Sequence, residues 1–357
     1  MANERSKSGI FKGRGATVSP DPRYLSTQRE AVVDDLPEED LEENPRTRWN
    51  VDTSRNVLTF NQSPDVGFDR SVNPYRGCEH GCVYCFARPT HAYLDLSPGL
   101  DFETRLFYKP DAVQQLRAAL SKRGYTPAPI ALGINTDAYQ PGERRWKITR
   151  ALVEALVELR HPFSIVTKSA LIERDLDLLG TAAQHNLVSV AFSITSLDSE
   201  LARRLEPRAA APARRLQALK TLSDAGIPTM VMIAPVIPAL TDHELETILA
   251  RAKEAGARDA GYVLLRLPLE VEPLFRQWLQ DHEPNKLDHV LNRVMEMRGG
   301  KMYKAAFHDR MRGEGVFADL LSKRFALAKR RLGFEGLPQL DCSRFQPPSS
   351  STQLSLW

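Results

Sequence analysis

Three of the four cysteines of this 357-residue chain lie within eight residues, in the order Cys78-Glu-His-Gly-Cys82-Val-Tyr-Cys85. Thiolates are the usual ligands of iron–sulfur clusters, and a cluster of four irons ordinarily takes four of them. Three ligands leave one iron with an open position for a substrate or cofactor, as at the open position of a catalytic metal site. Gly77 and Gly81 supply the backbone freedom that so tight a loop requires. The spacing therefore predicts a 4Fe–4S cluster with one exchangeable corner.

Two other interpretations of these cysteines stay open. A structural zinc ion could recruit His80 or His91 as a fourth ligand, because zinc tolerates such spacings. In that case the protein would be a zinc-stabilised, non-enzymatic binding module. A redox dithiol formed by Cys82 and Cys85 would leave Cys78 without a role.

The composition is that of a globular protein, with 42% hydrophobic residues, 26% charged residues and a formal net charge of +3. No stretch of the sequence approaches the roughly 20 apolar residues of a membrane helix. Residues 1–14 are polar and basic, without the apolar centre of a secretory signal. A tight cysteine trio, rather than spaced pairs, is typical of ligands in a reducing compartment. These features predict a cytoplasmic protein with no membrane partner.

Between about residues 66 and 283, short Val- and Ile-rich runs alternate with helical periodicity. Such runs indicate parallel strands that are buried on both faces. The candidate strands are Val72–Gly77, Ile130–Ile134, Phe163–Thr167, Leu187–Thr195, Thr229–Ala234 and Gly261–Arg266. The candidate helices are Lys147–Arg160, Leu171–Ala183, Pro212–Ala225 and Asp242–Ala255. Gly226 and Gly256 mark helix ends, and Thr241 with Glu244 predicts a capping box. This alternation predicts a parallel α/β core, either an open doubly wound sheet or a barrel.

The segments outside this core have different compositions. Residues 1–65 are predicted to be a mostly disordered arm, because Glu30–Glu43 carries eight acids and no Lys or Arg, although Val51–Phe60 could add a strand. Residues 284–332 are predicted to be a basic helical extension, since Lys286–Arg331 carries twelve Lys or Arg and five Asp or Glu. Pro and Ser clusters predict a flexible tail at 333–357.

The cysteine motif, with Tyr84 just before its last cysteine, resembles the signature of the radical S-adenosylmethionine (SAM) superfamily. The longer string Asn73-Pro-Tyr-Arg-Gly-Cys-Glu-His-Gly-Cys-Val-Tyr-Cys-Phe-Ala-Arg88 resembles the spore photoproduct lyase-like branch, often called DNA repair photolyase-related. The resemblance spans roughly residues 68–270 and continues in Thr136–Glu143, Thr167–Ser169, Phe192–Ile194, Leu205–Arg208 and Ala234–Pro238.

This resemblance implies both a fold and a chemistry. The fold would be a six-stranded partial (β/α)6 barrel with the site at the C-terminal ends of the strands, as is general for parallel barrels. The chemistry would be reductive cleavage of SAM bound to the open iron, giving methionine and a 5′-deoxyadenosyl radical that abstracts hydrogen from the substrate. A flavodoxin- or ferredoxin-type protein is the implied electron donor.

The family's cofactor contacts fall on residues at strand ends. The resemblance implies that Asn135, Thr136 and Asp137 bind the ammonium of SAM, although this run could instead cap the following helix. It implies that Lys168 pairs with the carboxylate of SAM and that Ser193 contacts the ribose or the carboxylate. The alternatives are an ordinary surface lysine and a buried hydroxyl bonded to backbone.

Three further residues could have either a functional or a structural role. Tyr84 belongs to the cluster motif and is a candidate cofactor contact. Glu206 and Arg208 are candidates for contacts to ribose or substrate, or for a structural ion pair.

The substrate is less clearly indicated than the cofactor. By the resemblance, photoproduct lyases carry a hydrogen-donating cysteine near the second-strand end, whereas Leu132–Asp137 contains none and Cys342 lies in the predicted tail. Spore photoproduct is therefore not expected as the substrate. The basic extension could supply phosphate contacts, which favours a nucleic acid over a protein or small molecule, or it could be an ordinary solvated face. The C-terminal Gln353–Trp357 resembles peptides by which bacterial repair and replication proteins bind the sliding clamp. No local motif names a catalytic residue for the substrate.

Overall fold

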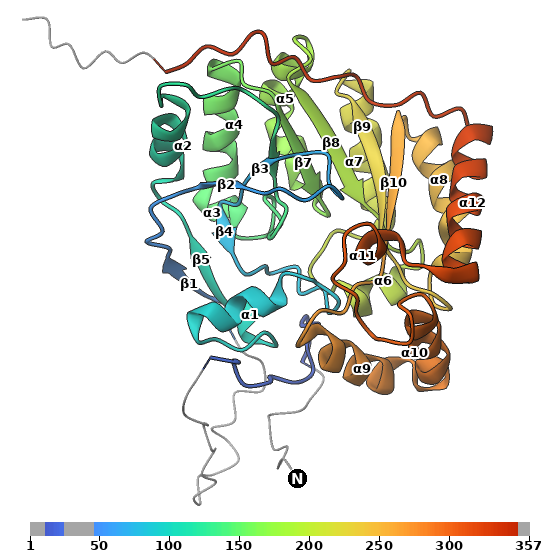
Figure 1. Ribbon diagram of the computed structural model, residues 1–357. Coiled ribbons are helices and arrows are strands. Elements are labelled where there is room, and N and C mark those ends of the chain that lie inside the picture. Colours follow the sequence, from blue (N-terminus) through green and yellow to red (C-terminus); the bar gives the residue numbers. More distant parts are fainter. Residues whose placement is uncertain (1–10, 25–45, 349–357) are drawn as a thin grey trace, which may run out of the picture.

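The computed structural model describes residues 11–24 and 46–348 (Figure 1). Seven strands form the main sheet, in the order β10-β9-β8-β7-β6-β3-β2. The six parallel strands are β3 (Arg70–Val72), β6 (Ile130–Leu132), β7 (Phe163–Thr167), β8 (Val188–Ser193), β9 (Thr229–Val236) and β10 (Asp259–Leu264). β2 (Leu58–Phe60) pairs antiparallel with β3. Because β2 and β10 are the two free edges of the described sheet, the barrel is partial, and the predicted six-stranded barrel is confirmed.

Helices connect successive parallel strands and cover the outside of the sheet (Figure 1). They are α2 (Ala112–Leu120), α3 (Glu143–Trp146), α4 (Ile148–Glu158), α5 (Leu176–Ala183), α7 (Pro212–Asp224) and α8 (Leu245–Glu254). In α4, Leu152, Val153 and Leu156 form the buried face, which packs into the main apolar cluster. The predicted helix ends are confirmed, since Gly226 and Gly256 follow α7 and α8 with φ values of 77° and 97°.

Strand β9 shows how the barrel acquires a hollow interior. Val231 and Ile233 point into the apolar cluster under the helices and are almost completely buried. Met230 and Met232, on the opposite face of the strand, line an internal cavity. The prediction of strands buried on both faces is therefore wrong for β9, because the inner face of the sheet borders this cavity.

The predicted strand Val72–Gly77 is misplaced. The barrel strand β3 ends at Val72, and Pro74, which has no N–H to donate, follows it. Residues 75–76 form β4, which pairs antiparallel with β5 (Arg105–Tyr108) in a second sheet that β1 (Arg48–Val51) completes. The chain thus leaves the barrel before it reaches the cysteines.

The predicted capping box of Thr241 and Glu244 is also wrong. The Thr241 hydroxyl accepts a hydrogen bond from the Ile237 N–H at 2.9 Å. The Glu244 carboxylate accepts hydrogen bonds of 2.6 Å from the Ser196 hydroxyl and the Leu197 N–H. Both side chains bind loops at neighbouring strand ends instead of each other's backbone.

The described parts of residues 1–65 pack against the rest of the protein, which differs from the mostly disordered arm predicted there. Ala16 is 1% exposed, and β1 and β2 belong to the two sheets. The acidic run Glu30–Glu43 that motivated the prediction lies in residues 25–45, outside the described residues.

Further helices lie at the ends of the barrel and beside it. Helices α1 (Asp101–Thr104), α6 (Ser199–Leu205), α9 (Val271–His282), α10 (Leu287–Glu296) and α11 (Asp309–Arg312) lie toward the C-terminal ends of the strands, in the lower half of Figure 1. Helix α12 (Gly315–Arg331) packs beside α8. None of the described helices is long and apolar enough to cross a membrane.

Residues 333–348, here called the C-terminal strap, cross the barrel at the N-terminal ends of the strands, at the top of Figure 1. The backbone N–H groups of Gly336, Asp341 and Gln346 bind carbonyls just before β10, β8 and β7 at 3.0, 2.9 and 2.9 Å. The strap therefore closes the end of the barrel opposite the cysteine loop. The candidate clamp peptide Gln353–Trp357 lies outside the described residues.

Candidate functional site

The three clustered cysteines lie on a loop that β4 introduces at the C-terminal side of the barrel. Cys78 and Cys82 are buried and Cys85 is partly buried, and all three line the internal cavity. Gly77 and Gly81 have φ values of 72° and 68°, which confirms that the loop requires the left-handed backbone region. A Cβ on Gly81 would lie 2.7 Å from a buried carboxylate oxygen, so the position is closed to larger residues.

A buried ion pair, which the sequence did not reveal, holds this loop from behind. The Arg88 guanidinium donates to the carbonyls of Cys82 at 2.9 Å and Gly81 at 3.2 Å, and it pairs with Glu103 at 2.5 Å. The Glu103 carboxylate also accepts hydrogen bonds from the N–H groups of Gly15 and Ala16, at 3.0 and 2.9 Å. Both charged side chains are fully buried. The N-terminal segment is thereby joined to the cysteine loop.

The donor set fits an iron–sulfur cluster better than a single zinc ion. Among the described residues, no three His, Cys, Asp or Glu side chains are grouped so that they could hold one metal ion. In a 4Fe–4S cluster each thiolate binds a different iron, so the sulfurs need not converge on one point. Burial raises the pKa of the Cys82 thiol to about 12 and also raises that of Cys78 and Cys85. Thiolates in this position therefore require a cationic centre, a condition that a cluster and a zinc ion would both meet.

The two histidines considered as zinc ligands have other neighbours. His80 Nδ1 lies 3.3 Å from a carboxylate oxygen of Asp137. His91 Nε2 lies 3.0 Å from the Arg105 carbonyl oxygen, and its ring packs edge-on against Phe102. Neither contact orients an imidazole toward a shared ion with the cysteines.

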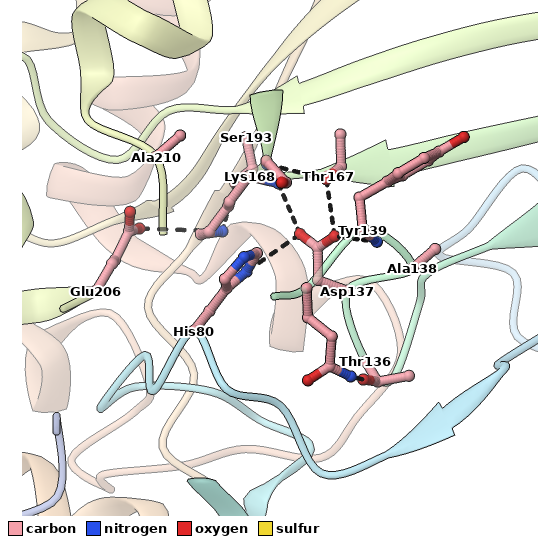
Figure 2. Close-up of polar contacts among 12 residues, drawn as sticks. His80, Thr136, Asp137, Ala138, Tyr139, Thr167, Lys168, Ser193, Glu206 and Ala210 are labelled. Atoms are coloured by element: carbon pink, nitrogen blue, oxygen red, sulfur yellow. Dashed lines mark hydrogen bonds and ion pairs between the residues drawn. The ribbon is translucent and has the colours of Figure 1, made fainter. Parts of the chain in front are cut away.

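Asp137 lies at the centre of a polar network beyond β6 (Figure 2). Its carboxylate accepts hydrogen bonds from the Thr167 hydroxyl and the Lys168 N–H, both at 2.7 Å, and from the Tyr139 N–H at 2.8 Å. Burial by itself would raise the pKa of Asp137, but His80 and these donors hold it at about 2. The carboxylate thus ties the end of β6 to the end of β7.

The two residues before Asp137 also have protein partners. The Thr136 hydroxyl donates to the Gly77 carbonyl at 2.7 Å and accepts a hydrogen bond from Gln140 at 2.9 Å. The Asn135 N–H donates to the Asn73 side chain at 2.9 Å. Residues 135–137 all line the cavity, so the structure places them beside the cysteine loop.

Lys168 and Ser193 meet at the ends of β7 and β8, as Figure 2 shows. The lysine ammonium donates to the Ser193 hydroxyl at 2.7 Å and lies 3.5 Å from the Ala234 carbonyl. It also lies 5.9 Å from the centre of the Tyr84 ring. With only 15% of its side chain exposed, Lys168 is a largely desolvated cation on the cavity wall rather than an ordinary surface lysine.

Glu206 forms a buried network with Arg215, a residue to which no sequence motif pointed. The Glu206 carboxylate accepts hydrogen bonds from Arg215, from the Tyr84 hydroxyl and, at 2.8 Å, from Thr195. Burial alone would raise the pKa of Glu206, but Arg215 and Lys168 lower it to about 2. The structural interpretation of Glu206 is therefore the one that the structure favours, and Glu206 fixes the orientation of Tyr84.

Arg208 points to the other side of the cysteine loop. Its guanidinium lies 3.1 Å from the Glu79 carboxylate, and its backbone N–H donates to the His80 carbonyl at 3.2 Å. It lines a smaller pocket of about 480 Å³ outside the main cavity.

The internal cavity has a volume of about 1390 Å³ and extends through the barrel. At one end it is bordered by the three clustered cysteines and Lys168, and Cys342 of the strap also lines it. Because the strap crosses the N-terminal strand ends, Cys342 is at the opposite end from the cluster loop. The cavity is large enough for a cofactor and a substrate together.

Comparison with known proteins places this geometry in a family. The model of the "Radical SAM superfamily" matches residues 72–252. An uncharacterized protein of Mycobacterium tuberculosis (strain H37Rv) is 38% identical over 248 residues, covering 69% of this chain and 72% of that protein. An uncharacterized protein of Methanocaldococcus jannaschii is 28% identical over 223 residues, covering 62% of this chain and 80% of that protein.

Solved structures show the same fold. A spore photoproduct lyase complexed with dinucleoside spore photoproduct superposes with a TM-score of 0.57 at 17% identity, covering 80% of this chain and 79% of that one. A mutant of that lyase with bound AdoMet and the same dinucleoside gives a TM-score of 0.54 at 18% identity, covering 80% and 77%. The family model covers half of the chain, and the parallel barrel is the fold of these lyases. The chain therefore belongs to the radical SAM superfamily and has a spore photoproduct lyase-like fold.

Proposed function

We propose that this protein is a radical SAM enzyme in which Cys78, Cys82 and Cys85 hold a 4Fe–4S cluster. The observation that carries the proposal is the position of the three cysteine thiols, two of them on buried residues and one on a partly buried residue, on the wall of the same cavity as Lys168. Such a cluster would supply the electron for reductive cleavage of bound SAM to methionine and a 5′-deoxyadenosyl radical, the species that would abstract hydrogen from the substrate.

The chain's own residues would bind and orient the cofactor. Lys168, a cation on the cavity wall beside the cysteine loop, could pair with the carboxylate of SAM, and it would then exchange its hydrogen bond with Ser193 for a charged one. Ser193, released from the ammonium, would be free to bond the ribose or the carboxylate. Thr136 and Asp137 already have protein partners. Any contact from them to the ammonium of SAM would use the oxygen lone pairs that remain.

Tyr84 would support the cluster loop rather than react. Its hydroxyl is bonded to Glu206, and its ring faces Lys168 at 5.9 Å. Holding Tyr84 fixes the segment between two cysteine ligands and keeps that side of the cavity closed to water. An acidic flavodoxin- or ferredoxin-type protein is the proposed electron donor.

The substrate is proposed to be a nucleic acid component other than spore photoproduct. The solved lyase in complex with a dinucleoside supports the class, and the lack of a cysteine in Leu132–Asp137 argues against the same reaction. Binding of the C-terminal Gln353–Trp357 to a sliding clamp remains a separate proposal, tested by comparing this peptide with one carrying Gln353→Ala and Leu356→Ala.

Anaerobic reconstitution tests the proposed chemistry. The wild-type protein should bind about four irons and four sulfides, turn brown, and release 5′-deoxyadenosine from SAM when reduced with dithionite. Cys78→Ala, Cys82→Ala and Cys85→Ala should each abolish the product, whereas Cys342→Ala, at the opposite end of the cavity, should retain the cluster. A colourless protein with one zinc and no iron would refute the proposal and support the binding module.

A further inference from the structure

Arg266 follows β10 at the C-terminal side of the barrel and lines the internal cavity. Its guanidinium carbon lies 5.0 Å from the centre of the Phe86 ring. Phe86 is the residue after the cluster ligand Cys85 and is 41% exposed. The guanidinium is therefore held at the cavity wall beside the cysteine loop, just after β10, the strand that forms one free edge of the sheet.

The hydrogen-bonding capacity of Arg266 is almost unused. Its Nη1 donates to the thioether sulfur of Met311 at 3.7 Å, and a thioether is a weak acceptor. Its Nε is buried without a partner, and within residues 11–24 and 46–348 it forms no ion pair. By contrast, the buried Arg88 and Arg215 each pair with a glutamate. A guanidinium is normally buried with a carboxylate or phosphate partner, so Arg266 lacks the anion that its position calls for.

Two more arginines add positive charge at this place. Arg312, at the end of α11, lines the same cavity and has no side-chain partner in the described part of the chain. Arg298 lies behind Arg266, is 1% exposed and donates to the carbonyls of Leu265, at 2.9 Å, and Asp309. Burial and then the neighbouring Arg266 lower the pKa of Arg298, which shows that the two charges are close.

The acidic side chains near these arginines already form ion pairs with other basic residues. Asp309 and Glu314 both bind the Lys304 ammonium at 2.7 Å. Asp65 also borders the cavity, and its side chain is 1% exposed and binds Arg310. Arg266 and Arg312 therefore place positive charge on this side of the cavity wall that no ion pair within the described residues balances.

We propose that Arg266 and Arg312 bind an anionic group of the substrate, a phosphate or a carboxylate, and hold it against Phe86 beside the cluster loop. This inference rests on the proposed function, because it assigns part of the same cavity to the substrate. The planar fork of a guanidinium matches either anion with two parallel hydrogen bonds. Such a contact would fix the substrate in the cavity. Lys168, which donates to Ser193 at the ends of β7 and β8, would bind the cofactor.

The test compares three probes that share one aromatic ring, namely phenyl phosphate, benzoate and benzyl alcohol. Their binding to the anaerobically reconstituted full chain is measured by titration calorimetry at low salt. We expect one of the two anions to bind at least tenfold more tightly than the neutral alcohol, and the tighter anion identifies the group. Arg266→Gln and Arg312→Gln should each weaken this anion about tenfold, and Arg266→Lys should restore part of the loss. Arg251→Gln, an exposed control on α8, should change nothing.

Two results would overturn this assignment. Equal binding of the anions and the alcohol would show that no anion site exists. Loss of SAM affinity in Arg266→Gln, with unchanged phenyl phosphate and benzoate binding, would assign Arg266 to the cofactor.

Formation of 5′-deoxyadenosine in the absence of substrate separates this inference from the proposed function. If the wild type cleaves SAM but binds no anion, the inference fails alone, and if it binds the anion but has no cluster, the proposed function fails alone.

Discussion

Glu206→Gln should destabilise the protein strongly, because it removes the charge that compensates a buried arginine. Glu206 and Arg215 have side chains that are 0% and 1% exposed. Glutamine has nearly the same shape, and its amide oxygen can still accept hydrogen bonds from Thr195 and Tyr84, whereas its NH2 group replaces the acceptor of Arg215. The change therefore removes the charge and the hydrogen bond to Arg215 and keeps the other two contacts. Removing one partner of a buried pair costs about 3–5 kcal/mol, since the other charge stays buried and uncompensated.

The lowered pKa of Glu206 implies a loss of stability of similar size in Glu206→Gln, and it determines how that loss depends on pH. Burial raises this pKa, but Arg215 and then Lys168 lower it from 4.5 to about 2. A lowered folded-state pKa means that the ionised carboxylate stabilises the fold above pH 4.5 and that this stabilisation is lost as the pH falls toward 2. A shift of this size corresponds to about 3 kcal/mol at neutral pH. The difference between wild type and Glu206→Gln should therefore shrink steadily below pH 4.5.

Urea unfolding followed by far-UV circular dichroism measures this difference. A double-mutant cycle with Arg215→Met should show that the double variant is more stable than the sum of the two single losses predicts. Glu158→Gln, which breaks an exposed pair with Arg117, is the matched control and should cost about 0.2–1 kcal/mol. A loss in Glu206→Gln no larger than in this control, or one that does not change with pH, would refute the account of the buried pair.

Three further outcomes follow from other parts of the site. Gly81→Ala should destabilise the protein by about 1–2 kcal/mol more than Gly124→Ala, because φ is positive at both but only at Gly81 would a Cβ lie 2.7 Å from a buried oxygen. Urea midpoints and iron content measure this, and equal losses would contradict it. Lys168→Met should raise the Kd for SAM about tenfold, and Ser193→Ala should raise it less; equal effects would argue against a carboxylate contact by the lysine. Burial lowers the pKa of His161 from 6.5 to about 4, so stability should fall as the pH drops from 6.5 toward 4. His161→Phe should flatten the pH–stability curve in that range, and an unchanged curve would assign the loss to other groups.

The elements that depend on local pattern were predictable from the sequence. The boundaries of strands β6 to β10 fall within two residues of the predicted ranges, because runs of buried branched residues bounded by turn residues mark them clearly. The cysteine loop with its two glycines was equally legible, since both the ligand type and the required backbone freedom are local properties.

The parts that were missed depend on contacts between distant segments. Glu103 binds N–H groups of residues 15 and 16, and nothing in the sequence around either marks the other. The capping box of Thr241 and Glu244 has a correct local pattern, yet both side chains bind other loops that the fold brings closer. The strap was predicted as a tail because its Pro and Ser residues form no regular element, whereas its backbone bonds to three loops fix its path.

Removal of the cluster should leave the protein folded. The cysteine loop is held by protein groups on each side: Arg88 binds its carbonyls, Glu206 binds Tyr84, and the Cys78 N–H donates to the Phe102 carbonyl at 2.9 Å. These contacts do not require a metal, in contrast to a structural zinc site, in which metal binding supplies most of the folding free energy.

The apo-protein, prepared with a chelator under reducing conditions, should therefore keep its far-UV circular dichroism and a cooperative urea transition. Cys78→Ala should behave in the same way, because a buried alanine in place of a neutral thiol leaves the loop contacts intact. A noncooperative transition in both preparations would mean that the loop folds around its metal. It would also restore the zinc-stabilised binding module, since a catalytic cluster in a preformed cavity need not hold the barrel together.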